Sequence, residues 1–270
     1  LSWFLDELTL NWCAFVVEKE DVYEAVFPVP YRRKFGVKYV FPPFFIQQLG
    51  LFSLDYSIEN ENRVISFLIQ KFKFIELNLN YKAERGEVRK NLVLNLNIGY
   101  TDIQNSYSKN HIRNLKKSEK SGLKIIKNSS PEDIISLFRS DRGSNLKIYS
   151  DLDYENLLNL CEIAGNQKAL MSLGVEQDSV LICGGVFMKF KNRIIFLFSG
   201  NSKVGKDTGA LFFLLNTVIK MYANSGYVLD FEGSENEGLS RFYSGFGACE
   251  ENYRVLKINN LPKVLKRIKK

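Results

Sequence analysis

Histidine is the scarcest catalytic residue type in this 270-residue chain, which contains only His111. The cysteines are also few and lie far apart, at Cys13, Cys161, Cys183 and Cys249, without a C-x-x-C pair. A lone histidine with no neighbouring thiol argues against a metal centre and against a Ser-His-Asp triad. The cysteine spacing signals neither a zinc site nor a disulfide framework, so we expect buried free thiols.

Long hydrophobic runs are missing as well. No stretch of about 18 uncharged apolar residues occurs, which argues against a transmembrane segment. The N-terminal stretch LSWFLDELTLNW carries two acids where a secretory signal would carry basic residues, so we expect a cytoplasmic protein. The composition, 45% hydrophobic and 13% aromatic, is nevertheless sufficient for one large core or two modest ones.

Positive charge is in moderate excess. Lys and Arg number 37 against 30 Asp and Glu, a net charge of +7. Much of the excess lies in KNHIRNLKKSEKSGLKIIK, residues 109–127, and in the C-terminal PKVLKRIKK. Such patches can bind RNA, membrane headgroups or an anionic substrate, and a solvated helix face is an equally good interpretation.

The first hundred residues mix short apolar runs with turn signals. The predicted strands are NWCAFVV, YEAVFPVP, FIELNLN and NLVLNLN, and the predicted helix is ENRVISFLIQKFK. The last two strands are joined through KAERGE, so we expect them to form a hairpin. Four prolines are expected to mark a loop: Pro28, Pro30, Pro42 and Pro43.

Longer helical patterns begin after Gly99. A basic helix is predicted over 101–122 and ends at Gly122, and three consecutive strands, ALMSLGVE, SVLICGGVFMKF and RIIFLFSG, predict an antiparallel meander. The later predicted elements are a helix over about 207–224, the strand YVLDFEG, a helix from about Asn236, the strand YRVLKIN and a short basic C-terminal helix. The fold class is α+β, in two domains covering 1–105 and 106–270.

The stretch FSGNSKVGKDTGALFF, residues 198–213, comes close to a nucleotide-binding P-loop. Gly200, Gly205 and Lys206 fit G-x-x-x-x-G-K, but Asp207 replaces the hydroxyl that would bind Mg²⁺. The preceding strands are hairpin-linked and hence antiparallel, whereas a P-loop needs a parallel sheet. Both observations argue against a nucleoside triphosphatase.

The start of the helix after this loop can still attract an anion, because its backbone N–H groups point at the turn. Lys203 and Lys206 add positive charge, and Gly205 and Gly209 allow close backbone approach. A diphosphate bound without metal fits this chemistry, and the pyrophosphate of coenzyme A is one candidate. An ordinary helix cap is the alternative.

Three stretches in the second half carry a family resemblance. SYSKNHIRNLKKSEKSGLKI is similar to a helix of the form R-R-x-I-R-K-A-x-K-x-G, and LDFEGSENEGLSRFYSGFGA to a D-F-x-G ending that closes on F-K-x-x-F-G. Asn236, Tyr243 and Gly247 fit N-x-x-x-x-x-x-Y-x-x-x-G. The segment from Lys203 occupies the place of an acyl-donor pyrophosphate loop. The second half therefore resembles the GNAT acyltransferase superfamily, and most closely its Fem-type branch of peptidyl and aminoacyl transferases.

This resemblance covers residues 106–260, and it implies two tandem GNAT-like domains with mixed, largely antiparallel sheets flanked by helices. The first domain matches only as a degenerate companion. Two departures stand out. Tyr243 replaces a lysine that many members carry after Phe, and no long helical hairpin of the kind found in some tRNA-using members is inserted.

The resemblance also implies roles for particular residues. Tyr243 matches the acid that protonates the leaving group; a phenol, with an ordinary pKa of about 10, suits a thiolate. Asp230 and Glu232 occupy alternate strand positions and so share a face, from which one can accept the amine's proton; Asp230 can instead pair with a basic residue. Phe242 is expected to be the core residue beside Tyr243. The expected donor-binding residues are Lys203, Val204, Gly205, Lys206, Thr208, Gly209, Asn236 and Arg241, of which Lys203 and Arg241 can equally be plain surface charges.

Three functions follow from these features. The leading one is transfer of an acyl group from a coenzyme A thioester, without a metal, to an amine on a small molecule or a peptidoglycan or lipid precursor. The second is a Fem-type transferase that uses aminoacyl-tRNA, held by the basic helix 109–127. The third is a non-catalytic binding protein that keeps the GNAT fold.

Overall fold

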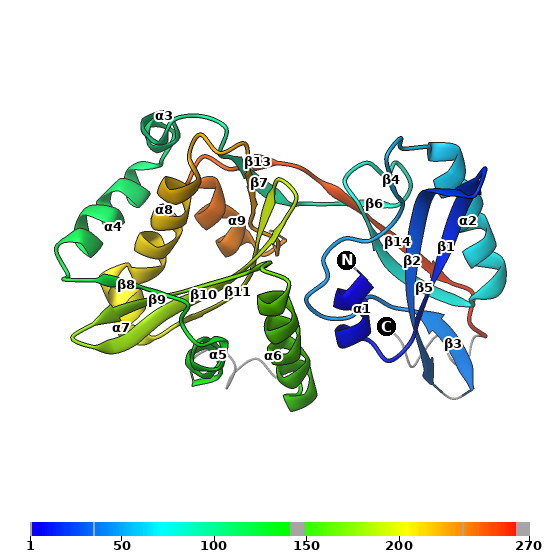
Figure 1. Ribbon diagram of the computed structural model, residues 1–270, viewed down its shortest axis with the longest axis horizontal. Helices are drawn as coiled ribbons and strands as arrows, with labels where there is room; N and C mark the ends of the chain where they lie inside the picture. The colour runs from blue at the N-terminus through cyan, green and yellow to red at the C-terminus, as the bar shows by residue number, and fades with distance from the viewer. Residues whose placement is uncertain (1, 35, 141–148, 234, 263–270) are drawn as a thin grey trace. The chain divides into compact units, whose positions relative to one another are not determined.

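A computed structural model describes residues 2–34, 36–140, 149–233 and 235–262 (Figure 1). Their contacts form two compact units. Unit 1 comprises the described residues up to Lys90 together with those from Glu251 onwards, and unit 2 comprises Asn91–Glu250. This division differs from the predicted ranges 1–105 and 106–270. The reason is that β14 (Tyr253–Asn259) returns to pair antiparallel with β5 (Phe74–Leu79) of unit 1.

In its described residues, unit 1 is a mixed sheet with two helices, α1 (Ser2–Leu8) and α2 (Ile58–Lys71). Its strand order is β1-β2-β3-β5-β14-β6, with β4 paired to β2. The predicted α2 is confirmed: Ser57 caps its first turn, and Leu68 is among the apolar side chains that it buries. The remaining strands are β1 (Trp12–Lys19), β2 (Val22–Lys34), β3 (Val37–Val40), β4 (Phe52–Ser53) and β6 (Glu87–Arg89).

Two expectations for this unit are wrong. Pro28 and Pro30 lie inside β2, where they face Ala14 and Trp12 of β1, and do not mark a loop. The predicted hairpin through KAERGE does not form either. β5 pairs with β14, while the second predicted strand becomes β7 (Leu92–Asn95) and belongs to the other sheet. Local hydrophobic pattern identified both strands, but the pairing partner came from the far end of the chain.

Unit 2 contains one mixed sheet in the order β13-β7-β12-β11-β10-β9-β8. The predicted antiparallel meander is confirmed as β9, β10 and β11. Besides β7, the strands are β8 (Lys124–Lys127), β9 (Leu170–Gln177), β10 (Val180–Phe190), β11 (Arg193–Asn201), β12 (Val228–Asp230) and β13 (Cys249–Glu250). The helices are α3 (Tyr100–Asn105), α4 (Lys109–Glu119), α5 (Pro131–Phe138), α6 (Asp151–Asn166), α7 (Lys203–Thr208), α8 (Ala210–Tyr222) and α9 (Glu237–Ser244).

Helices cover both faces of this sheet, and two adjacent glycines of β10 let them approach the sheet closely. A Cβ at Gly184 would lie 2.5 Å from Cγ1 of Ile134 in α5, and a Cβ at Gly185 would lie 2.8 Å from Cδ2 of Leu214 in α8. Because successive strand residues face opposite sides, α5 and α8 pack on opposite faces of the sheet (Figure 1). The missing side chains allow both helices to approach closely.

Two predicted helices are divided. The expected basic helix 101–122 separates into α3 and α4, because Ser108 has extended backbone and its hydroxyl caps α4 through the amide of His111. The helix expected from about residue 207 starts earlier, at Lys203. Gly209, in the left-handed conformation with φ 78°, separates the short α7 from α8. The predicted basic helix at the C-terminus falls outside the described residues.

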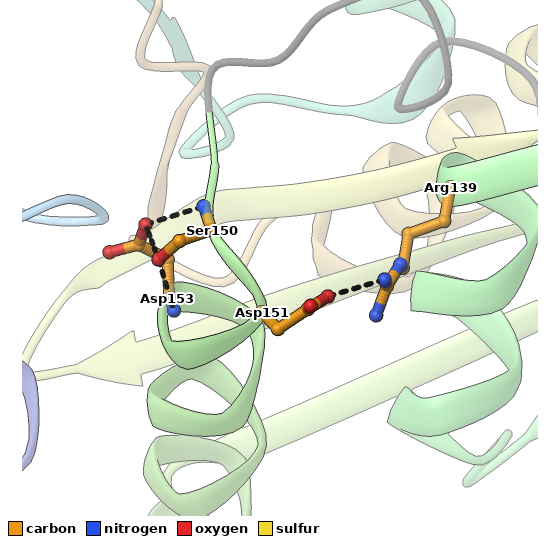
Figure 2. Close-up of polar contacts among 4 residues, drawn as sticks. All are labelled: Arg139, Ser150, Asp151 and Asp153. Carbon is orange, nitrogen blue, oxygen red and sulfur yellow. Dashed lines mark hydrogen bonds and ion pairs between the residues drawn. The ribbon is translucent and has the colours of Figure 1, made fainter.

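Two reciprocal hydrogen bonds fix the start of α6 (Figure 2). Ser150 accepts a hydrogen bond from the amide of Asp153, whose carboxylate accepts from the amide of Ser150, so the two residues form a capping box. Beside it, Arg139 just after α5 pairs with Asp151 at 2.6 Å. Neither α6 nor any other helix in the described part of the chain is both long and apolar enough to span a membrane.

Candidate functional site

The centre of the unit 2 sheet contains a strand fork. β11 and β12 run parallel but pair only over Arg193–Ile195 and Val228–Asp230. β11 then continues to Asn201 along β10, whereas β12 ends at Asp230 and the chain turns away towards α9. The residues that follow β12 directly, Phe231 and Glu232, are therefore placed where the two strands separate.

Asp230 is held at the fork by three donors. It is 3% exposed, and its Oδ2 lies 2.5 Å from Nη1 of Arg193. Its Oδ1 accepts hydrogen bonds from the side-chain amide of Asn91 at 2.9 Å and from the backbone N–H of Glu232 at 3.1 Å. These donors satisfy the oxygens of an almost fully buried carboxylate, whose burial would otherwise be costly. This geometry fits the ion-paired alternative for Asp230.

Glu232 also lies at the fork, but it is not part of strand β12 as predicted. The shared-face argument required the strand to continue, but β12 ends at Asp230 and Glu232 adopts a left-handed φ of 44°. The two acids are still close enough to interact. Burial is the main cause that raises the pKa of Glu232 well above its usual range, the negative charge of Asp230 adds to it, and Arg193 partly opposes it. Backbone strain of this kind occurs preferentially at functional sites.

Tyr243 lies against the fork. Its ring stacks on that of Phe231, with 4.6 Å between ring centroids and 15° between planes, and it meets Phe196 of β11 edge-on at 6.3 Å. Tyr243 is buried and Phe242 only partly so, which reverses the expected packing of these neighbours. Tyr243 thus packs on Phe231, the residue that separates Asp230 and Glu232 in the sequence.

The predicted donor loop consists of α7, Gly209 and the start of α8. Ser202 caps α7 by accepting from the amide of Gly205 at 3.1 Å. A Cβ at Gly205 would lie 2.5 Å from the carbonyl oxygen of Ile182, so this glycine is required by packing on β10. Gly209 is required by its left-handed φ, and the carbonyl oxygen of Asn114 in α4 lies 3.1 Å from where its Cβ would be. Local packing therefore explains both glycines.

The start of α8 differs from that of α7, because its N-cap, Gly209, supplies no side-chain hydrogen bond. Nearby, Lys203, Val204 and Lys206 are exposed, while the hydroxyl of Thr208 donates to the carbonyl oxygen of Val204 at 2.8 Å. A side-chain-free helix start beside two lysines is chemistry that suits an anion. Gly209 and Ala210, which begin α8, are themselves buried, and Asp207 adds an opposing exposed charge, so the diphosphate site stays a prediction.

The last two predicted donor residues lie on α9. Asn236 is its N-cap and accepts from the amide of Leu239 at 3.1 Å, which gives it a structural role at the helix start. Arg241 is exposed in the last turn of the helix. Both residues thus belong to the helix that carries Tyr243, and not to the α7–α8 loop.

Sequence reasoning missed two members of the fork, Asn91 and Arg193. Asn91 is fully buried, and Arg193 is the first residue of the otherwise uncharged β11. A charged residue that opens a buried strand is a weak signal by itself, and only the fold shows its partner Asp230. No group of three or more His, Cys, Asp or Glu residues within the described ranges could hold a metal ion.

No protein family model matches the chain, and no curated protein matches it either. Solved structures do. FemX superimposes with a TM-score of 0.66 over 96% of this chain and 90% of that chain, at 12% identity. L-PGS from Bacillus licheniformis gives 0.55 over 99% and 93%, at 11% identity. A tandem GNAT protein from the clavulanic acid biosynthesis pathway gives 0.53 over 94% and 84%, at 8% identity.

The chain has a Fem-type, GNAT-like fold. The neighbours confirm the resemblance seen in the sequence and the class of two tandem GNAT-like domains with mixed sheets flanked by helices. At these identities the likeness establishes the fold alone. The Fem-type match extends through unit 1, which the sequence related to the family only loosely.

Proposed function

We propose that this protein is an N-acyltransferase that moves an acyl group from a coenzyme A thioester to an amine acceptor. One observation carries the proposal: Tyr243 stacks on the ring of Phe231, the residue between Asp230 and Glu232. Acyl transfer to an amine needs a group that takes a proton from nitrogen and another that gives one to the leaving group. The fork supplies carboxyl groups for the first task and a phenol for the second.

The remaining parts of the fork suit the same chemistry. β11 separates from β12 after Ile195, and an open strand beside the reaction centre can offer backbone N–H groups to a developing oxyanion. The start of α8, with Lys203 and Lys206 near it, would hold the diphosphate of the donor. For the acceptor we propose an amine on a peptidoglycan or lipid precursor, because the fold neighbours include FemX and L-PGS.

A second candidate, transfer from aminoacyl-tRNA, is favoured by α4. Its exposed face carries five basic residues and one acid, Glu119, which is a suitable footprint for a polyanion. The basic residues are Lys109, Arg113, Lys116, Lys117 and Lys120.

Donor binding separates the two candidates. We would measure the thermal midpoint of the protein with acetyl-CoA and, separately, with aminoacylated and deacylated tRNA at fixed salt. If the coenzyme A proposal is right, acetyl-CoA raises the thermal midpoint. The variant Lys203→Ala/Lys206→Ala should then bind acetyl-CoA with an apparent Kd about tenfold higher, because charge-assisted contacts are lost. The control variant, Lys19→Ala/Lys73→Ala, removes two exposed lysines of unit 1 and should bind normally. An increase with aminoacyl-tRNA alone would overturn the proposal in favour of the second candidate.

A further inference from the structure

Strand β1 forms one edge of the unit 1 sheet and differs from the other edge strands. It is 8 residues long, and the stretch WCAFVV at its start carries no charge. The other edge strands in the described part of the chain, β4, β6, β8 and β13, have between 2 and 4 residues each. In addition, β8 begins and ends with lysine, and β6 begins and ends with a charged residue. Short or charged strands protect a sheet edge from further pairing, and the WCAFVV stretch of β1 has neither protection.

Two prolines of β2 determine which backbone groups of β1 face this edge. Pro28 pairs with Ala14, and Pro30 pairs with Trp12. Because proline has no N–H group, these pairs belong to the set that exchanges no hydrogen bonds, and the alternate residues of β1 bond to β2. The N–H and C=O groups of Trp12, Ala14 and Val16 therefore point to the edge, where no other described strand lies.

The side chains of β1 are apolar on both faces of the sheet at this edge. On one face, Val16, Val26 and Phe52 lie opposite one another across β1, β2 and β4. Val16 is 44% exposed and Phe52 47%. On the other face, the ring of Phe15 meets that of Phe67 in α2 edge-on, with 4.9 Å between centroids, which holds β1 in place. An added strand would thus meet a fixed edge, and a large apolar side chain suits the position beside Val16.

Strand β1 of a second copy of the chain meets these requirements. In an antiparallel pair centred on Ala14 of each copy, Trp12 of one copy lies opposite Val16 of the other and extends its apolar row. All the edge-facing residues then pair with one another, giving about six backbone hydrogen bonds, and the charged Glu18 and Lys19 lie beyond the ladder. A shift by one residue would set edge groups against groups already bonded to β2. A shift by two would lose a pair or bring Glu18 opposite Trp12.

We propose that β1 is a dimer interface, at which two copies of the chain join their unit 1 sheets antiparallel about a two-fold axis at Ala14. Such an interface is isologous, because both copies use the same surface. One strand pair buries less area than a standard stable interface, so the dimer should form at concentrations on the order of tens of micromolar. This inference concerns assembly and is independent of the proposed function.

Sedimentation velocity over about 2–200 μM protein tests the dimer. Ala14→Pro removes the central donor of the ladder and, like Pro28 and Pro30 opposite it, needs no N–H group for the β1–β2 pairing. Val16→Lys retains the N–H group and places a charge in the interface. Each variant should raise the Kd of the dimer at least about tenfold, and circular dichroism checks that both remain folded. The control, Val88→Lys, makes the same change at a 55% exposed position of the edge strand β6 and should dimerise normally.

Hydrogen exchange followed by NMR tests the register. The amides of Trp12, Ala14 and Val16 should exchange freely in dilute protein and slow at least about threefold as the concentration rises, whereas the amide of Phe15, bonded to β2, should be protected throughout. A dimer that Ala14→Pro and Val16→Lys both leave unchanged overturns the proposal, as does a dimer without this protection. A wild type that stays monomeric also overturns it. If the monomer then gains the same protection from the synthetic peptide NWCAFVVE, the occupant of the edge is a foreign extended segment.

Discussion

The imidazole of His111 lies 2.8 Å from the carbonyl oxygen of Phe242, measured from Nε2, and joins α4 to α9. A carbonyl oxygen only accepts, so Nε2 carries the proton and Nδ1 accepts from the hydroxyl of Ser108, also at 2.8 Å. The ring is 3% exposed and lies among Phe212, Phe242 and Phe246. The only histidine of the chain is thus a neutral, buried structural residue close to the helix that carries Tyr243.

This arrangement predicts a pH-dependent stability. Burial lowers the pKa of His111 in the folded protein, while the bond to Phe242 partly opposes that shift. The stabilisation from neutral His111 is therefore fully present above the unfolded pKa of about 6.5, and it is lost as the pH falls through the lower folded value. Urea unfolding between pH 4.5 and 7.5 should show this loss.

The control for that measurement is His111→Gln, which should be less stable at pH 7 and lack the decline between pH 7 and 5. A decline of equal size in the variant would show that carboxyl groups cause it. The two tryptophans, Trp3 and Trp12, both lie in unit 1, so their fluorescence does not report on His111. Hydrogen exchange at amides of α4 and α9 follows unit 2 directly.

Adding a methyl group at Gly245 tests the packing of the His111 ring. A Cβ at this position would lie 2.6 Å from Nε2 of His111 and closer still to other ring atoms, although the φ of −67° is ordinary. We expect Gly245→Ala to destabilise unit 2 by about 1–3 kcal/mol, because the packed ring has to move. Gly165→Ala in α6 is the matched control. Its nearest contact would be 3.9 Å away, so it should be neutral or stabilise by up to about 1 kcal/mol.

Sequence patterns predicted most elements of unit 2 because these depend on local signals. The meander follows from apolar strands separated by short turns, and the structure confirms it as β9, β10 and β11. The predicted hairpin of unit 1 failed because β14, more than 150 residues further along the chain, pairs with β5 and with β6. Local pattern carries no information about such a partner.

The candidate site was predictable only in part. Motif resemblance singled out Tyr243, Asp230 and Glu232, and the fold places all three at the fork. The expected common face of the two acids failed because backbone conformation after Asp230 departs from a strand, which residue alternation cannot anticipate. Asn91 directly precedes β7 and Arg193 begins β11, and their contacts with Asp230 exist only in the folded sheet.

The capping box of α6 predicts that replacing Ser150 lowers the stability of unit 2 (Figure 2). Ser150→Ala removes the acceptor of the Asp153 amide hydrogen and should lower the free energy of unfolding of unit 2 by about 1 kcal/mol. Ser121→Ala is the comparison: its hydroxyl donates to the carbonyl oxygen of Lys117 after the end of α4 and is not an N-cap, so the loss should be smaller. Equal losses measured by hydrogen exchange in α6 and in α4 would contradict the capping argument.

Two ion pairs of unit 2, Arg193–Asp230 and Arg139–Asp151, should differ sharply in double-mutant cycles. Arg193 and Asp230 have side chains 25% and 4% exposed, whereas Arg139 and Asp151, drawn in Figure 2, are 49% and 80% exposed. Arg193→Met alone leaves Asp230 buried and uncompensated, so we expect a loss of about 3–5 kcal/mol, which is partly recovered when Asp230→Asn is added. The coupling energy should reach about 1–3 kcal/mol for this pair and stay below about 0.5 kcal/mol for Arg139→Met with Asp151→Asn. Moderate salt should leave the coupling energy of the Arg193–Asp230 pair unchanged, because buried pairs are screened much less than exposed ones. Equal coupling in the two cycles would mean that the Arg193–Asp230 pair is solvated and would contradict its burial at the fork.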